Sequence, residues 1–317
     1  IGWLAVGEHV GPVAAIVAIG LLLRFTQILV DIGTLASAFE TRRPVLDLSH
    51  EILSAPELPA PKGVRRADEA PASSGASVAL EDVSFSYEAD HPVLQGVSFR
   101  VEPETMTAIV GPSGAGKSTL LRLIARLYEI SGGNLLYSGT ASSDISIPAV
   151  RAKIGLVQQE SPLILGTLLD NVYISGRGTD SAAAHRILKD LGLEKVLERS
   201  GHGVDLNIGG SGTSLSGGEK QRLAIARVIL KNPQVYLLDE FTSQLDGISE
   251  ELVVSVLNNN AAPESTMIMV AHRMSTVVNA DMIYVMDHGR IVAQGTHDIL
   301  MEFSPLYREL VSNQLIH

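Results

Sequence analysis

The first fifty residues carry an apolar stretch that predicts a membrane helix. No charged residue occurs from Val10 to Leu23, a run of 14 residues. As a helix this run is only about 21 Å long, too short to cross a bilayer. Extending it to Val30 gives 21 residues and adds a single charge, Arg24. Apolar residues continue at roughly helical spacing through Asp31–Leu53, so we expect the helix to continue beyond the membrane.

Two charged residues interrupt this region seven positions apart, Arg24 and Asp31, and therefore lie on one face of the predicted helix. In one interpretation this face lines a translocation cavity. In the other, both residues lie at the inner edge of the membrane, snorkelling or paired with another helix. The sequence favours neither interpretation over the other. Arg42 and Arg43 follow the span, and the positive-inside tendency places that end in the cytoplasm.

A change in composition marks the end of the helical region. Ser54–Ser77 contains four prolines and a Ser/Gly/Ala run, which is typical of a linker. Its basic residues Lys62, Arg65 and Arg66 suit lipid headgroups, but a solvated linker is the favoured interpretation. We therefore expect three parts: the C-terminal part of a transmembrane domain at 1–53, a linker at 54–77 and a compact domain at 78–317.

Short apolar strands alternate with helices throughout the third part. The predicted strands are Val78–Val83, Val97–Val101, Thr105–Val110, Leu135–Tyr137, Ile154–Val157, Val235–Asp239, Thr266–Val270, Met282–Met286 and Ile291–Ala293. The predicted helices are Leu120–Leu127, Ser181–Leu191, Glu194–Arg199, Ser216–Leu230, Ile248–Leu257, a helix after Arg273, and Leu306–Leu315. This alternation predicts an α/β fold built on a mainly parallel sheet.

Composition narrows the possible partners. The formal net charge is −11, so we expect no nucleic-acid partner. The chain has no cysteine, which excludes disulfides and thiolate ligands and suits a reducing compartment. A mean hydropathy of +0.22 indicates a membrane portion. Arginine outnumbers lysine, and alanine and valine are plentiful, which is a weak sign of a GC-rich bacterial genome. Because the first residue is Ile1 and not methionine, we expect the chain to be a fragment or to lack its start.

One motif carries the clearest chemistry. The segment Gly111–Thr119 matches the phosphate-loop pattern G-x-x-x-x-G-K-[ST] between a strand and a helix. Its glycines let the backbone curl and bring amides onto a phosphate, at the N-terminus of the helix. Lys117 places a positive charge near the β- and γ-phosphates, and Ser118 offers its hydroxyl to Mg²⁺. The predicted nucleotide-binding residues here are Gly111, Pro112, Ser113, Gly114, Ala115, Gly116, Lys117, Ser118 and Thr119.

A second element supplies carboxylates. The apolar strand Val235–Asp239 ends in Asp239 and Glu240. Asp239 is placed to hold Mg²⁺, directly or through water, and Glu240 is placed to polarise an attacking water molecule. The less favoured interpretation is an ordinary surface acidic pair after a strand.

A third element is a further anion-binding turn. Leu215–Glu219 reads LSGGE and opens a predicted helix. Ser216 and the amides of Gly217 and Gly218 lie at the helix N-terminus, where phosphates bind. Two phosphate-binding turns far apart in one chain indicate that each serves a different face of a dimer.

These motifs together resemble the nucleotide-binding domain of an ATP-binding-cassette (ABC) transporter, whose signature motif is LSGG. The resemblance implies a P-loop cassette with a helical signature subdomain that binds ATP and Mg²⁺. It implies that Tyr87 stacks on adenine, that Gln159 reaches Mg²⁺ and the water, and that His272 contacts the γ-phosphate. Ser243–Asp246 resembles the loop that crosses to the partner subunit, and Ile208–Gly212 resembles the exporter-type segment that touches the coupling helices.

The N-terminal segment is similar to the last transmembrane helix of an exporter-type half-transporter, which fuses six helices to one cassette. The resemblance implies a multi-pass protein of the cell membrane, most simply a bacterial inner membrane, with the cassette in the cytoplasm. It also implies a second half-transporter as partner, either identical or different, and an unidentified solute. The implied catalytic residues are Glu240, His272, Gln159 and Lys117, and the implied Mg²⁺ ligands are Ser118, Gln159 and Asp239.

The sequence departs from the family pattern at two positions. LSGGE replaces the commoner LSGGQ, so Glu219 adds negative charge near a phosphate site, and SQLD replaces SALD. Neither change removes a catalytic group, so we expect a hydrolytic site rather than a regulatory half. A soluble cassette ATPase is disfavoured by Val10–Val30 and by the acidic balance. Export is the expected direction, and an exporter-shaped importer, for example of a siderophore, is the alternative.

Overall fold

The structure is a computed structural model that describes residues 12–54, 76–88, 90–160, 162–174, 180–208, 214–271 and 274–315. Contacts within the chain divide it into two units, Ile1–Leu58 and Pro59–His317, which are described separately below. Most of the predicted linker 54–77, and the predicted site residue His272, lie outside the described residues.

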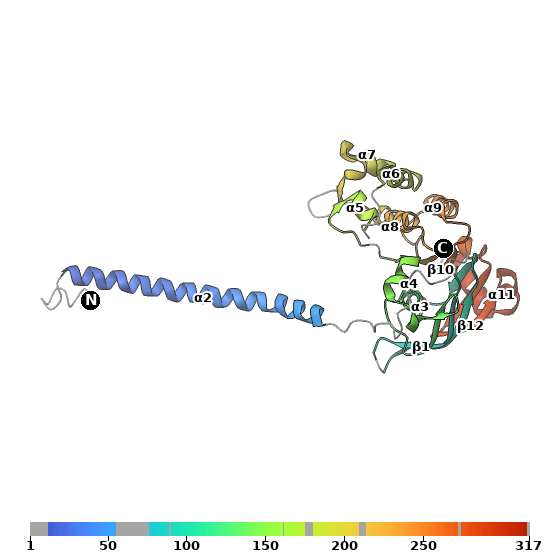
Figure 1. The fold of residues 1–317 in the computed structure, drawn as a ribbon, viewed down its shortest axis with the longest axis horizontal. Helices are drawn as coiled ribbons and strands as arrows, with labels where there is room; N and C mark the ends of the chain where they lie inside the picture. The colour runs from blue at the N-terminus through green and yellow to red at the C-terminus, as the bar shows by residue number, and fades with distance from the viewer. Residues whose placement is uncertain are drawn as a thin grey trace. The chain divides into compact units, whose positions relative to one another are not determined.

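The described part of the first unit, residues 12–54, is a single helix. Helix α2 runs without a break over Pro12–Ser54, 43 residues (Figure 1), so the predicted continuous helix is confirmed from Pro12 onward. Apolar residues are spread around its circumference rather than gathered on one side, as expected of a helix that faces lipid. The segment Ile16–His50, with hydropathy 1.8, is long and apolar enough to cross a membrane. Within it the Gln27 Nε2 donates to Asp31 Oδ1 at 3.1 Å.

The second unit is built on a six-stranded sheet with the order β12-β11-β3-β10-β9-β6. All neighbouring pairs are parallel except β11 and β12, which form an antiparallel hairpin. The predicted α/β fold with a mainly parallel sheet is therefore confirmed. The strands are β3 Met106–Val110, β6 Ile154–Val157, β9 Val235–Asp239, β10 Thr266–Val270, β11 Met282–Asp287 and β12 Arg290–Gly295.

A second, antiparallel sheet with the order β2-β1-β4-β5 was not distinguished by the sequence pattern. Its strands are β1 Val78–Ser86, β2 Pro92–Val101, β4 Gly132–Tyr137 and β5 Thr140–Ala141. Strand β1 extends beyond its predicted end, and strand β2 begins before its predicted start. The two strands form an antiparallel hairpin, and the added residues pair with each other near its turn. Buried and less buried positions alternate along β2, as in a sheet with one face in the core.

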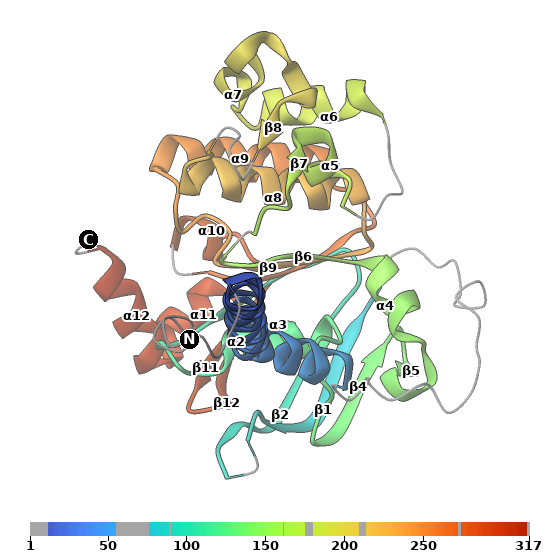
Figure 2. The same ribbon diagram turned by 90° about the vertical axis from the view of Figure 1, so that its left-hand side faces the viewer.

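The helices form two groups. Helix α3 (Lys117–Ile124) and α4 (Ile147–Lys153) lie near the sheets, with α10 (Met274–Val277), α11 (His297–Phe303) and α12 (Pro305–Leu315) in the last part of the chain. The other group is a helical lobe of α5 (Leu168–Val172), α6 (Ser181–Asp190), α7 (Glu194–Glu198), α8 (Gly217–Lys231) and α9 (Gly247–Asn260). Figure 2 shows this lobe gathered on one side of the central sheet, which corresponds to the predicted helical subdomain.

Short elements complete the described part of the second unit. In the lobe, strands β7 (Gly166–Thr167) and β8 (Asn207–Ile208) pair antiparallel, and 3₁₀ turns lie at Arg199–Gly201 and Gly203–Asp205. A further 3₁₀ turn, Ser142–Asp144, follows β5. Helices α4, α5 and α11 escaped prediction because each spans two turns or fewer, too short for a clear helical period. Helix α3 begins at Lys117 and not at Leu120, because the end of the phosphate loop already forms its first turn.

Two hydrophobic cores lie on opposite faces of the central sheet. Along β9, Tyr236 and Leu238 pack into the core shared with the helical lobe, whereas Val235 and Leu237 pack into the core shared with α3 and the antiparallel sheet. Successive strand residues point to opposite faces, so each central strand is buried on both sides. This double burial fixes the register of β9 and so the position at which its polar residues emerge.

We predict that Leu237→Ala lowers the free energy of unfolding by about 2–5 kcal/mol, because it opens a cavity where the side chain is 0 % exposed. Val292→Ala on β12, where the side chain is 53 % exposed, is the control and should change it by no more than about 0.5 kcal/mol. All seven tyrosines lie in the second unit, so urea unfolding followed by tyrosine near-ultraviolet circular dichroism reports on that unit. Equal effects of the two variants would contradict the assigned core.

Candidate nucleotide-binding site

The phosphate loop connects β3 to α3 and depends on glycine at two positions. Gly111 has φ +153°, and a Cβ there would lie 2.1 Å from the Met286 carbonyl oxygen. Gly116 has φ +96°, and its Cβ would lie 2.7 Å from a Leu94 side-chain carbon. Both positions therefore require a residue without a side chain, since neighbouring backbone or core atoms occupy that space. The loop is held tightly on its inner side and faces a cavity on its outer side.

This cavity has a volume of about 510 Å³, within the usual range of small-molecule sites. It joins segments that are far apart in the sequence. Predicted site residues that line it are Ser113, Gly114, Gly116, Lys117, Ser118, Thr119, Gln159 and Glu240. Val93, from β2, also lines it and was not predicted; an apolar residue in a strand carries no sequence signal for such a role.

Lys117 is buried at the bottom of the loop. Its Nζ donates to the carbonyl oxygens of Gly111 at 2.8 Å and Pro112 at 2.9 Å. Burial lowers the pKa of the ammonium group, while the nearby carboxylates of Glu240 and Asp239 oppose that shift. The lysine thus lies among oxygen atoms of the loop and close to the acidic end of β9, where it can interact with a phosphate.

Ser118 and Asp239 are brought together although they lie 121 residues apart. The Ser118 Oγ donates to Asp239 Oδ1 at 2.9 Å. Asp239 is buried, and this burial raises its pKa, an effect that the Ser118 hydrogen bond partly offsets. A hydroxyl and a carboxylate are the hard oxygen ligands that Mg²⁺ accepts, usually together with phosphate oxygens and water. These residues fit the predicted Mg²⁺ site.

Among the residues that the structure describes, no group of three or more His, Cys, Asp or Glu side chains could hold a metal ion. The chemistry of the donor set therefore suits an ion shared between the protein and a nucleotide.

Glu240 adopts an unusual backbone conformation directly after β9. Its φ is +48°, a region that non-glycine residues rarely adopt without surrounding constraints. The Glu240 N–H donates to the Val270 carbonyl oxygen at 3.0 Å, which continues the pairing of β9 with β10. The residue lines the cavity opposite the phosphate loop. The fold therefore holds this carboxylate at a defined place near the loop.

Gln221, which the sequence analysis did not single out, supports that conformation. It lies buried on α8, and its Nε2 donates to the Glu240 carbonyl oxygen at 3.1 Å. Its Oε1 accepts the N–H of Gln244 at 3.1 Å. Gln221 thus connects helix α8, which begins at the signature motif, to Glu240 and Gln244 in the segment after β9. A polar residue on the buried face of a predicted helix is the sequence signal that could have identified it.

Tyr87 lies at the border of the cavity. Its hydroxyl is 3.1 Å from the Thr119 Oγ1 and accepts a hydrogen bond from Arg122 Nη1 at 3.2 Å. The ring packs edge-on against Phe85 and Tyr128, at centroid distances of 4.9 and 5.1 Å. Tyr87 thus contacts the end of the phosphate loop without lining the cavity that the described residues form.

The signature turn, Leu215–Glu219, lies outside the lining of this cavity. Ser216 caps the N-terminus of α8, and Gly217 lines a second cavity of about 510 Å³, next to Gln159 and Gln221. Asp246 caps α9 by accepting the Ser249 N–H at 2.8 Å. Within the described part of the chain, neither Ser216, Gly217, Gly218 nor Asp246 lines the cavity of the phosphate loop. The structure therefore separates the two predicted anion sites.

The chain matches the family model described as ABC transporter over residues 94–243. It is 40% identical over 299 residues to the mycobactin import ATP-binding/permease protein IrtB of Mycolicibacterium thermoresistibile, covering 94% of this chain and 51% of that protein. It is 37% identical over 300 residues to the mitochondrial iron-sulfur clusters transporter ABCB7 of Oryzias latipes, covering 93% of this chain and 39% of that protein.

A solved structure of a bacterial Atm1-family ABC exporter with ATP bound is also similar. The TM-score is 0.75 at 34% identity, covering 92% of this chain and 51% of that one. The chain thus spans about half, or less, of the length of the proteins it matches.

We predict that Asp239→Asn raises the free energy of unfolding at pH 7 in the absence of nucleotide and Mg²⁺. Burial raises the pKa of this carboxyl in the folded protein, so its ionised form destabilises the fold above that pKa. The penalty is lost as the pH falls through the folded pKa to the ordinary aspartate value, and the gain of the variant should vanish there. Urea midpoints measured between pH 7 and pH 4 test this.

Asp170→Asn is the matched control with the opposite sign. Hydrogen bonds from Thr167 lower the pKa of Asp170, so its ionised form stabilises the fold above the ordinary aspartate pKa. This variant should be less stable than the parent at pH 7, and the difference should shrink as the pH falls through the lowered pKa. A loss of stability in Asp239→Asn at pH 7 would contradict the assigned cost of burying that carboxylate.

Proposed function

Because this chain carries the ATP-binding domain of the ABC transporter family, we propose that it is the ATP-hydrolysing subunit of a transporter that moves a solute across a membrane. One observation carries the proposal. Lys117, Ser118 and Glu240 line one cavity, and Asp239 is hydrogen-bonded to Ser118 beside it, although the phosphate loop and the end of β9 are distant in the sequence. Each of these side chains has a role in phosphoryl transfer.

The phosphate loop binds the nucleotide. Lys117 and the loop amides hold the β- and γ-phosphates, and Tyr87, whose hydroxyl lies 3.1 Å from the Thr119 Oγ1, is proposed to stack on the base. Ser118, Asp239 and Gln159 would hold Mg²⁺. When bound, Mg²⁺ neutralises charge on the phosphate oxygens.

Glu240 carries the hydrolytic step. Its carboxylate polarises a water molecule and accepts a proton from it as the water oxygen attacks the γ-phosphorus. The bond from that phosphorus to the bridging oxygen breaks, which leaves ADP and phosphate. The strained backbone at Glu240 and the hydrogen bond from Gln221 hold the carboxylate in place. His272 is proposed to contact the γ-phosphate.

The signature turn serves a second cassette. In the described residues it does not line the cavity of its own phosphate loop, yet it has the amides and the hydroxyl of an anion site. Two copies facing each other would each close the other's nucleotide with Ser216 and Gly218, and Asp246 would lie in the segment that crosses between them. ATP binding then favours the closed pair and hydrolysis releases it, which is a population shift between two arrangements.

Helix α2 couples this cycle to transport. Its apolar surface and length suit a membrane span, and we propose that it belongs to a multi-pass transmembrane domain with the cassette in the cytoplasm, in a bacterial inner membrane. Export is the proposed direction, as for the Atm1-family exporter that the structure resembles. The match to a mycobactin import protein over 94% of this chain favours import of a siderophore as the second candidate.

We predict that the 317-residue chain carrying Glu240→Gln, in detergent, doubles its protein mass when ATP and Mg²⁺ are added. Removing the group that polarises water should stop hydrolysis and trap the closed pair. Light scattering corrected for detergent measures the mass, and phosphate release should fall by at least about a hundredfold.

Two controls separate the steps. Ser216→Arg in the same background should still bind ATP but remain single, because it blocks the signature turn and leaves the phosphate loop intact. Lys117→Ala should bind no ATP. Tight ATP binding without doubling would contradict self-pairing, and unchanged hydrolysis in Glu240→Gln would contradict the role of Glu240.

A further inference from the structure

The carboxylate of Glu219 closes the first turn of the signature helix α8. Its Oε2 accepts the Ser216 N–H at 2.8 Å, and the Ser216 Oγ accepts the Glu219 N–H at 3.3 Å. This reciprocal pair is a capping box, which fixes the start of a helix. The turn that should receive a phosphate is therefore shaped by a side chain that is itself an anion.

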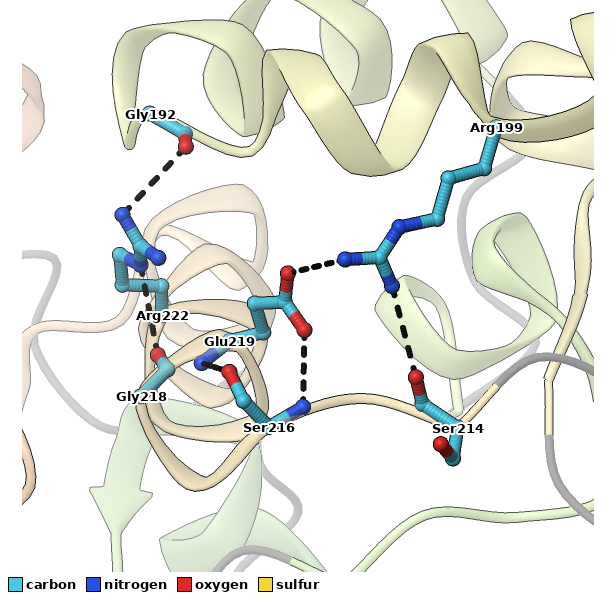
Figure 3. A network of polar contacts seen from close by, with 7 residues as sticks. All are labelled: Gly192, Arg199, Ser214, Ser216, Gly218, Glu219 and Arg222. Atoms are coloured by element: carbon cyan, nitrogen blue, oxygen red, sulfur yellow. Dashed lines mark hydrogen bonds and ion pairs between the residues drawn. The ribbon is translucent and has the colours of Figure 1, made fainter.

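Arg199 holds the other oxygen of that carboxylate. Its Nη2 donates to Glu219 Oε1 at 2.7 Å, and its Nη1 donates to the Ser214 carbonyl oxygen at 3.4 Å. Figure 3 shows the Arg199 guanidinium, at the end of α7, pointing toward both Glu219 on α8 and Ser214 in the segment before that helix. A single side chain thus contacts the signature turn on both sides of Ser216.

The carboxylate is charged and largely withdrawn from water. The Glu219 side chain is 13% exposed and that of Arg199 is 39% exposed. Burial opposes ionisation of Glu219, but the hydrogen bonds from Ser216 and the charge of Arg199 outweigh it and lower the pKa of the carboxyl. Glu219 is therefore ionised at neutral pH, and its charge lies within one helical turn of the predicted anion site.

A carboxylate at this place has two opposite effects. It stabilises α8, because negative charge at a helix N-terminus interacts favourably with the helix dipole. It also repels a second anion that approaches the same turn, and this repulsion is strong where water is excluded. The commoner glutamine would supply the same cap without the charge. The arginine is the group in the structure that offsets the repulsion.

We propose that Arg199 is a positioning residue of the signature turn. It holds Glu219 in its capping geometry and cancels its charge, so that Ser216 and Gly218 receive the γ-phosphate bound by a second copy of this chain. The inference rests on the proposed function, because it requires two cassettes that pair across ATP. It adds the residue that makes a glutamate acceptable in the signature turn.

A neighbouring arginine provides a comparison. Arg222 lies on α8, one turn after Glu219, and donates to the carbonyl oxygens of Gly218 and Gly192, each at 3.3 Å (Figure 3). These contacts brace the helix against α6 through neutral acceptors. Loss of Arg222 should therefore weaken the lobe whatever residue stands at 219, whereas loss of Arg199 should impair pairing mainly while position 219 carries a charge.

The test uses the full chain with Glu240→Gln, in detergent, and compares the parent with Arg199→Gln, Glu219→Gln and the double variant of these two. The comparison variants are Arg199→Lys, Arg222→Gln and Arg222→Gln combined with Glu219→Gln. Two quantities are measured for each. One is the ATP concentration, with Mg²⁺, that half-saturates the doubling of mass. The other is the affinity for ATP at a dilution where the chain is single, which reports on the phosphate loop alone.

We expect Arg199→Gln to raise the half-saturating ATP concentration for pairing about tenfold, corresponding to about 1.4 kcal/mol, with the affinity of the single chain unchanged. The double variant should return to within about twofold of Glu219→Gln, because no uncompensated charge remains. Arg199→Lys, which keeps the charge, should stay within about threefold of the parent. Arg222→Gln should not be rescued by Glu219→Gln.

Each alternative outcome has a separate meaning. If the double variant pairs as weakly as Arg199→Gln, or if Arg199→Gln pairs like the parent, Arg199 does not compensate Glu219 and the inference is wrong. If the parent binds ATP but never doubles, self-pairing itself fails, and the role of Arg199 fails with it. The affinity of the single chain distinguishes both results from misfolding, because an unfolded variant would lose that binding too.

Discussion

The hydrogen bond from Ser118 to Asp239, 2.9 Å long, is the contact on which the site depends. It joins the phosphate loop to the end of β9, and it can form only because β3 and β9 both lie beside β10 in parallel. Parallel strands bring their carboxyl ends to one edge of the sheet, where ligands bind in open α/β folds. The two cores that bury the strands on both faces hold this edge in register. Without that register the hydroxyl and the carboxylate would not meet.

The same edge of the sheet holds charged side chains whose burial destabilises the folded chain when no ligand is bound. Burial lowers the pKa of Lys117 and raises that of Asp239, so both charged forms carry a desolvation cost. Glu240 adds a strained backbone, which Gln221 supports from the signature helix. Such local costs are typical of sites that are optimised for a ligand rather than for stability. The Gln221 hydrogen bond also connects the helical lobe directly to the backbone of Glu240.

Much of this arrangement could be predicted from the sequence, because its signals are local. The phosphate loop, the strand that ends at Asp239 and the helix that begins at the signature turn each carry their pattern within about ten residues. What escaped prediction depends on tertiary contacts. The antiparallel sheet has the same short apolar strands as the parallel one, and only pairing separates them. Val93 reaches the site through packing, which no linear pattern encodes, whereas Gln221 left only an indirect signal, a polar residue on the buried face of a predicted helix.

Glu219 illustrates the limit of a motif more sharply. Read along the chain, it is a change of charge beside a phosphate-binding turn, and it argues for weaker binding. In the structure its carboxylate forms an ion pair with Arg199, which lies twenty residues earlier and on a different element. The electrostatic character of the turn is thus a property of the pair, and the same glutamate would have a different effect beside a neutral neighbour. A signature motif in which glutamate replaces glutamine should therefore be judged together with the residue that faces it, because that residue decides whether the turn attracts or repels a phosphate.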